Sequence, residues 1–235
     1  MSEALAAIYA PLDRLAPGSP ATVARALSIA GTGPAARVLD AGCGTGADVP
    51  ALLAAEGVGE VVAMDMIPAF TERLSARIAD PRLTVLAGDM TAPPGSFDLI
   101  WAMGAAYAPG MDAALSAWRG HLRPGGRVAL SDLVWRVAAP STEARAFWAE
   151  DYPAIGDASA FAARIAGAGF RVLGQFWQDA GDWSAYYEPL ARRLDEIAPG
   201  DPAMDEAVAA IRREIALWRA HGDDYGYLLA VIEAA

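Results

Sequence analysis

The sequence contains no lysine, no asparagine and only one cysteine among its 235 residues, and it has just two histidines. The single cysteine, Cys43, excludes a disulfide framework. The few histidine and cysteine residues lack the spacing of metal ligands, so we expect no bound metal. No apolar run approaches the ~20 residues that a membrane-spanning helix requires. Because arginine supplies all 18 basic residues, we interpret the bias as that of a GC-rich bacterial genome.

Basic residues are also scarce relative to acidic ones, with 18 against 29 and a net charge of −11. Nucleic acids select basic surfaces, and anionic membranes attract basic segments. The charge therefore predicts neither a nucleic-acid nor a membrane partner. Glu3 and Asp13 interrupt the start of the chain, which does not resemble a secretory signal, so we expect a cytoplasmic protein. The length and the 54% hydrophobic content suit a single α/β domain.

What the chain does contain is a glycine-rich turn directly after an apolar strand, at residues 38–46. Helix-forming residues follow at positions 47–55. Gly42, Gly44 and Gly46 allow backbone torsions that are closed to other residues, and they let a ligand lie against bare main chain. The free N–H groups at the start of the following helix point at that ligand. The arrangement is typical of α/β proteins that hold a nucleotide-like cofactor.

The spacing of the glycines indicates which cofactor is bound. A dinucleotide fingerprint reads G-x-G-x-x-G, whereas here the glycines alternate and position 47 is alanine. Asp40, inside the turn, would repel a pyrophosphate and attract a cation. A NAD-dependent reductase is therefore disfavoured. The segment resembles the first motif of the class I S-adenosylmethionine (SAM)-dependent methyltransferases, whose cofactor carries a sulfonium and an ammonium but no phosphate.

Further parts of that family's pattern follow in order. The resemblance implies that Asp65, 19 residues past Gly46, binds the ribose hydroxyls and that Met66 packs on the adenine. It implies that Asp89 accepts a hydrogen bond from the adenine amino group, beside the backbone N–H of Met90. The implied cofactor site comprises Asp40, Gly42, Gly44, Gly46, Asp65, Met66, Asp89, Met90 and Ala102, and the product is S-adenosylhomocysteine (SAH).

The same resemblance implies an α/β fold with a seven-stranded, mostly parallel sheet and helices on both faces. The strand order is 3-2-1-4-5-7-6, with strand 7 antiparallel. We expect one methyltransferase domain in three parts. Residues 1–36 form an N-terminal helical cover, with a helical stretch at 2–16 that Pro11 interrupts and a helix at 21–30. Residues 37–132 form the SAM-binding core, and residues 133–235 form an acceptor-side lid together with strands 6 and 7.

The acceptor side is predicted from an enrichment in aromatic residues, since residues 135–187 hold 11 of the 20 in the chain. Such a lining suits a small aromatic or apolar acceptor, or a cationic amine held by ring faces. Phenylalanine and tryptophan are more often core residues, so we expect about half of these side chains to face the pocket. The candidate acceptor-binding residues are Met103, Tyr107, Trp135, Trp148, Tyr152, Trp183, Tyr186 and Tyr187.

Two residues are candidates for the chemistry. Methyl transfer is an in-line displacement at a carbon that the sulfonium already activates, so alignment of the reactants supplies most of the catalysis. A general base is needed only when the acceptor starts protonated. Tyr107, shortly after the fourth strand, could orient the acceptor. Asp132, at the end of the fifth strand, could act as a base, whereas His121 and His221 lie away from the cofactor.

These patterns predict methyl transfer from SAM to a small-molecule acceptor. An RNA or protein methyltransferase is one alternative, which the acidic charge and the lack of a basic segment disfavour. A SAM-binding sensor or assembly protein without transferase activity is another, and it would fill its acceptor pocket with bulky side chains. The sequence does not identify the acceptor atom, and it leaves homodimer formation open.

Overall fold

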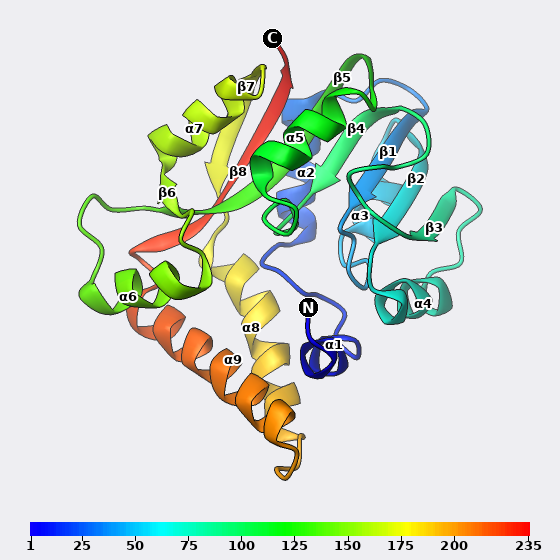
Figure 1. Cartoon of the computed structure of the whole chain (residues 1–235). Helices are drawn as coiled ribbons and strands as arrows, with labels where there is room; N and C mark the ends of the chain where they lie inside the picture. Colours follow the sequence, from blue (N-terminus) through cyan, green and yellow to red (C-terminus); the bar gives the residue numbers. More distant parts are fainter.

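The computed structural model describes residues 1–235 as one mixed sheet with helices around it (Figure 1). The strands are β1 (Ala36–Ala41), β2 (Val58–Asp65), β3 (Leu83–Ala87), β4 (Phe97–Ala102), β5 (Leu122–Trp135), β6 (Gly156–Asp157), β7 (Phe170–Trp177) and β8 (Tyr225–Ala234). The helices are α1 (Glu3–Tyr9), α2 (Pro20–Ala30), α3 (Val49–Ala54), α4 (Pro68–Arg77), α5 (Met111–Arg119), α6 (Thr142–Asp151), α7 (Ala158–Gly167), α8 (Ala180–Asp195) and α9 (Pro202–His221).

The sheet confirms the predicted strand order. Its strands run β3-β2-β1-β4-β5-β8-β7, and β8 is antiparallel to both of its neighbours. The predicted sixth and seventh strands are therefore β7 and β8. One addition is β6, two residues that pair with the end of β5. The fifth strand also extends past Asp132 to Trp135, because β8 pairs with it as far as Tyr225.

The N-terminal region differs from the prediction of a helix over residues 2–16. Helix α1 ends at Tyr9, and residues 10–19 run without regular helix to the Ser19 N-cap of α2. Proline lacks the N–H that a continuing helix needs, so Pro11 ends the pattern. Helix α2 begins at Pro20 and ends at Ala30, and its C-cap Gly31 adopts a left-handed conformation with φ 58°.

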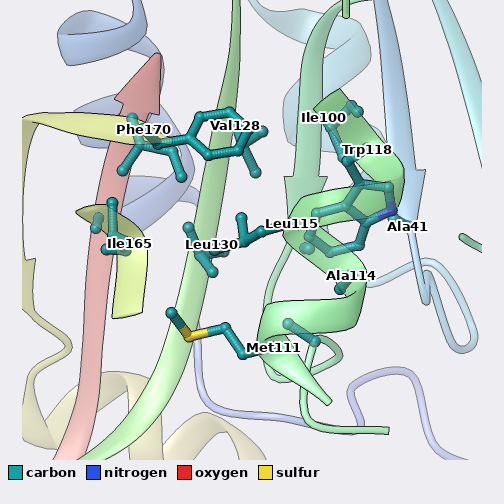
Figure 2. Packing of buried hydrophobic residues seen from close by; sticks show 14 of the residues in the cluster. Ala41, Ile100, Met111, Ala114, Leu115, Trp118, Val128, Leu130, Ile165 and Phe170 are labelled. Carbon is teal, nitrogen blue, oxygen red and sulfur yellow. The ribbon is translucent and has the colours of Figure 1, made fainter. Parts of the chain in front are cut away.

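Two apolar layers cover the two faces of the sheet. Side chains of a strand alternate between faces, so Leu39 joins one layer and Val38 the other. Figure 2 shows the first layer, in which Trp118 and Leu115 of α5 and Ile165 of α7 pack against the strands. Helices α2, α3 and α4 contribute to the second layer. The doubly covered sheet is the α/β architecture that the sequence predicts.

A third cluster lies beyond one edge of the sheet, where α8 and α9 extend beside α1 (Figure 1). It buries aromatic side chains from α6, α8 and β8 together with the aliphatic face of α9. Helix α1 contacts both α8 and α9. No helix of the structure combines the length and the apolar character that crossing a bilayer requires.

Candidate active site

A cavity of about 690 Å³ opens at the carboxyl ends of β1, β2 and β4. Strand β1 lies between β2 and β4, so the direction of strand order reverses at this point. Ligands of open α/β sheets bind at such switch points. The lining comes from the loops after four strands and from the N-terminal segment, which contributes Met1, Leu5, Arg14, Leu15 and Ala16.

The glycine turn forms the floor of the cavity and has no room for side chains. Gly42 has φ 73°, and a Cβ there would lie 2.5 Å from the Cβ of Ala105. Gly44 has φ 52°, and a Cβ there would lie 2.9 Å from Leu15 Cδ1. Both glycines line the cavity, as predicted.

Gly46 serves packing instead of lining the cavity. Its φ is 80°, and a Cβ there would lie 2.3 Å from Cδ1 of the buried Leu74. The absence of a side chain at Gly46 lets α4 approach the turn. Gly46 was predicted to bind the cofactor, but it lies beneath the cavity instead. Ala102 is likewise fully buried and does not line the cavity. Its side chain belongs to the core layer beneath α5.

Asp65 ties the end of β2 to the glycine turn. Its Oδ2 accepts from the backbone N–H of Gly44 at 2.9 Å, and its Oδ1 accepts from that of Ile67 at 2.9 Å. Burial raises the pKa of this carboxyl, whereas the backbone N–H groups act in the opposite direction. The half-buried carboxylate lines the cavity. Each oxygen keeps a lone pair for a further donor.

Asp40 is buried beneath the turn, and its carboxylate lines the cavity without a hydrogen-bond partner. Burial raises its pKa well above the ordinary value, the charges of Asp48 and Asp65 add to this, and Arg14 opposes it. An unpartnered buried carboxylate is costly unless a cation or a donor meets it. The site is therefore built for a ligand group that is positively charged or rich in donors.

Asp48 and Arg14 are neighbours of Asp40 that the sequence analysis did not identify. Arg14 donates to Asp48 at 2.6 Å, and the indole N–H of Trp101 donates to the same carboxylate at 3.0 Å. Asp48 comes directly after the glycine turn, but nothing in the spacing links it to a residue 34 positions earlier. The pair consumes the only arginine of the cavity lining.

The N-terminal segment is fastened across the turn by further contacts of the same kind. The hydroxyl of Thr45 donates to the carbonyl of Asp13 at 3.0 Å. The carboxylate of Asp13 pairs with Arg73 and Arg77 of α4. Residues 13–16 therefore roof the cavity, held on both sides.

The predicted adenine side lies at the rim. Oδ1 of the exposed Asp89 accepts from the backbone N–H and the hydroxyl of Thr91, at 2.8 and 2.7 Å. These bonds lower the pKa of Asp89. The lining includes Asp89, Met90 and Met66, and Met66 is 67% exposed. An apolar side chain at such a rim can cover a flat ligand.

Two of the predicted acceptor residues, Met103 and Tyr107, line the cavity. Tyr107 is half exposed, and its ring meets that of Tyr152 edge to face at 6.4 Å. Tyr152 itself is not part of the lining, because its hydroxyl turns away to donate to Asp132 at 2.8 Å.

Asp132 lies outside the cavity, and the structure contradicts its predicted role as a base. The hydroxyl of Tyr152 donates to both of its oxygens, and Arg164 approaches at 3.4 Å. The backbone N–H of Leu133 also donates to it. Although burial raises its pKa, the carboxylate is enclosed by protein donors. Its hydrogen bonds hold the hydroxyl of Tyr152.

Most of the other predicted acceptor residues belong to the third apolar cluster. Trp148, Trp183, Tyr186 and Tyr187 are buried there, and Trp135 packs edge to face on Tyr225. None of them lines the cavity. Burial of large rings stabilises the packing of α8 and α9, so their enrichment after residue 135 reflects the core of this region.

Comparisons with known proteins agree with this geometry. Residues 38–126 match a family model described as "Methyltransferase domain". An O-methyltransferase of Pyrenophora dematioidea is 28% identical over 210 residues, covering 85% of this chain and 75% of that protein. The solved structure of a SAM-dependent methyltransferase from Geobacter sulfurreducens with SAH has a TM-score of 0.84 and 20% identity. It covers 100% of this chain and 99% of that one. A SAM-dependent methyltransferase from Thiobacillus denitrificans with SAH has a TM-score of 0.82, 21% identity and the same coverage.

The solved structures show a shared fold, and the family match contains the glycine turn, Asp65 and Asp89. The architecture is that of the Rossmann-like, class I methyltransferases. Residues 38–126 therefore resemble a methyltransferase domain, and the whole chain shares the fold of solved SAM-dependent methyltransferases.

Proposed function

We propose that this protein transfers the methyl group of SAM to a hydroxyl oxygen of a small molecule. The observation that carries the proposal is the unpartnered carboxylate of Asp40 in a cavity that also contains Tyr107 and Met103. The same cavity therefore contains a carboxylate that can bind a cation and a wall formed by the ring of Tyr107 and the apolar side chain of Met103. The curated relative is named an O-methyltransferase, which favours oxygen as the acceptor atom.

The residues present fit the cofactor. Asp40 would attract the ammonium of the methionine part, and the free lone pairs of Asp65 would accept from the ribose hydroxyls. Met66 would cover the adenine, and Asp89 would accept from its amino group. The bare backbone at Gly42 and Gly44 leaves room for the ligand to lie close. Four lining carboxylates against one paired arginine favour a cationic donor over a phosphorylated cofactor.

The cofactor supplies a methyl group that its sulfonium activates for displacement. The chain's contribution is to hold the two reactants in line, which can supply about 7–11 kcal/mol of the barrier reduction. Tyr107 would orient the acceptor from the loop after β4. The roof of residues 13–16 would keep water from the reacting atoms.

A small acceptor is favoured over the alternatives. The net charge of −11 opposes an RNA substrate, and a cavity of about 690 Å³ suits small molecules. A non-catalytic SAM sensor would have filled the space beside Tyr107. Here Trp183, Tyr186 and Tyr187, the rings able to fill it, pack in the core instead. The open space supports a transferase.

Calorimetric titration of the purified protein with SAH, beside NADH as a control, tests the cofactor assignment. We expect micromolar binding of SAH and none of NADH. Methyl transfer from SAM with a radiolabelled methyl group to a set of small phenols and alcohols then tests the acceptor. Binding of SAH without transfer to any hydroxyl compound would contradict the proposed acceptor atom, and equal binding of NADH would contradict the cofactor site.

A further inference from the structure

Helix α9 carries a carboxylate on its inner face that the proposed function does not use. Glu214 lies between Ile211 and Ile215, which are both buried in the third cluster. The hydroxyl of Tyr187 donates to its Oε1 at 2.6 Å. No arginine pairs with Glu214, and burial raises its pKa. An apolar residue would cost less there, because a half-buried carboxylate without a cationic partner destabilises the fold.

The inner face of α1 leads from the cofactor cavity toward this carboxylate. Leu5 lines the cavity, and Tyr9 lies four residues later on the same face of the helix. The hydroxyl of Tyr9 is 3.1 Å from that of Tyr186, which neighbours Tyr187 on α8. Burial first, and then the charge of Glu214, raises the pKa of both Tyr9 and Tyr107. Hydroxyl contacts thus join Tyr9 of α1 to Tyr186 of α8, and the adjacent Tyr187 to Glu214 of α9.

Strand β8 adds a further hydroxyl to this region, that of Tyr227. A Cβ on Gly104, a lining residue of the cavity, would lie 3.7 Å from the hydroxyl of Tyr227. The ring of Tyr227 packs on Trp183 at 5.5 Å. Tyr227 and Glu214 are half-buried, although burial raises the pKa of each. Tyr227 therefore reaches the cavity wall at Gly104 from β8, and both Tyr227 and Glu214 keep accessible surface.

We infer that Tyr9, Tyr107, Tyr227 and Glu214 line an acceptor chamber that continues the cofactor cavity toward α9 and takes a phenol without an acidic substituent. This inference rests on the proposed function. The phenol hydroxyl would donate to the carboxylate of Glu214, and its ring would lie among the tyrosine rings. An acidic substituent would meet Glu214, Asp40 and Asp65, while the nearby Arg14 already pairs with Asp48.

The test uses three ring-matched phenols that differ in charge: neutral 4-ethylphenol, cationic tyramine and anionic 4-hydroxyphenylacetate. Each is titrated calorimetrically into the full-length protein saturated with SAH. We expect the anion to bind at least about tenfold more weakly than the other two, because like charges repel in a site of low dielectric. In Glu214→Gln we expect the neutral phenol to lose about tenfold in affinity and the penalty on the anion to shrink by a similar factor.

Glu206→Gln is the matched control, since Glu206 is an exposed carboxylate of the same helix. It should bind all three phenols as the unchanged protein does. Equal affinity for the anion and the neutral phenol, no effect of Glu214→Gln, or no phenol binding at all while SAH still binds would each overturn the chamber. Failure of SAH to bind would instead overturn the proposed function itself, so the two failures are distinguishable.

Discussion

The cofactor cavity and the proposed acceptor chamber hold their carboxylates in different ways. At the cofactor end, Asp40 and Asp65 lie at the carboxyl ends of neighbouring parallel strands, and the glycine turn lies between them. At the proposed acceptor end, Glu214 lies on α9 and accepts from Tyr187 of α8, and α1 packs against both helices. Backbone geometry within one βαβ unit fixes the first end, whereas packing of distant segments fixes the second.

This difference predicts which substitutions should impair cofactor binding and which should impair acceptor binding. A substitution in the glycine turn alters the backbone that carries the cofactor, so binding and folding should fail together. A substitution at the acceptor end alters one side chain of a packed helix layer, so it should change selectivity or rate while cofactor binding persists. The predictions below test this separation.

Gly42→Ala should have the largest effect. The new Cβ would lie 2.5 Å from Ala105 and 3.1 Å from Met90 Sδ, at a backbone φ of 73° that alanine avoids. We expect a loss of stability of about 2–4 kcal/mol and a loss of SAH affinity of at least about 100-fold. Chemical denaturation and calorimetry measure the two quantities.

Gly33→Ala is the matched control, because a Cβ at Gly33 meets no atom within 4 Å. It should leave SAH affinity unchanged. If Gly42→Ala folded normally and bound SAH normally, the bare backbone of the turn would have no role, and the contrast between the two ends would lose its basis.

Asp65→Ala should come next, with SAH affinity falling by roughly 10–100-fold. The change removes both the acceptor for the ribose and the bonds that hold Gly44 and Ile67, and each bond to a charged acceptor contributes about 1.5–3 kcal/mol. Calorimetric titration measures the loss. Asp223→Ala, an exposed aspartate away from the cavity, should bind as before. Unchanged affinity in Asp65→Ala would remove this residue from the site.

The cofactor end could be predicted from the sequence because its geometry is local. Once a strand enters a glycine turn, the following strands place Asp65 and Asp89 at the same edge, and the family resemblance supplies the strand order. Gly46 and Ala102 were harder to place, because the spacing of residues along the chain does not show whether a residue faces the cavity or the core. Gly46 faces Leu74 of α4, and Ala102 faces the core beneath α5.

The acceptor end could not be predicted in the same way. Aromatic enrichment after residue 135 does not distinguish residues that line a pocket from residues that form a core. Most of these rings are buried in the core between α8 and α9. Arg14, Tyr9 and Glu214 reach the region from opposite ends of the chain, so no motif links them. One signal was available for Glu214, since a charge interrupts the apolar face of Ile211 and Ile215.

Asp40→Asn should separate binding from stability. Burial raises the pKa of Asp40 in the folded chain, so ionising it near neutral pH costs stability that asparagine restores. We expect SAH affinity to fall by about tenfold, while the melting temperature rises by about 2–4 °C for each kcal/mol regained. The gain should vanish below about pH 3.9, where the carboxyl is protonated in the folded and the unfolded chain.

Thermal unfolding of Asp40→Asn and the unchanged protein between pH 3 and 8 measures this dependence, with Asp223→Asn as the exposed control. A variant that loses stability at neutral pH would show that Asp40 is a structural carboxylate. Retained SAH affinity would show that the ammonium binds elsewhere.

Tyr107→Phe should have the smallest effect. It should lower turnover at the acceptor end and leave cofactor binding unchanged. The ring stays in the wall and keeps its edge-to-face contact with Tyr152, but the hydroxyl that would orient the acceptor is lost. A single neutral hydrogen bond contributes about 0.5–1.5 kcal/mol, so turnover should fall by roughly 3–10-fold while SAH affinity changes by less than about twofold. Steady-state methyl transfer and calorimetry on the same preparation measure both. Because Tyr107 lines the same cavity as Asp65, an equal loss of turnover and SAH affinity would make it a cofactor residue and would join the two ends into a single site.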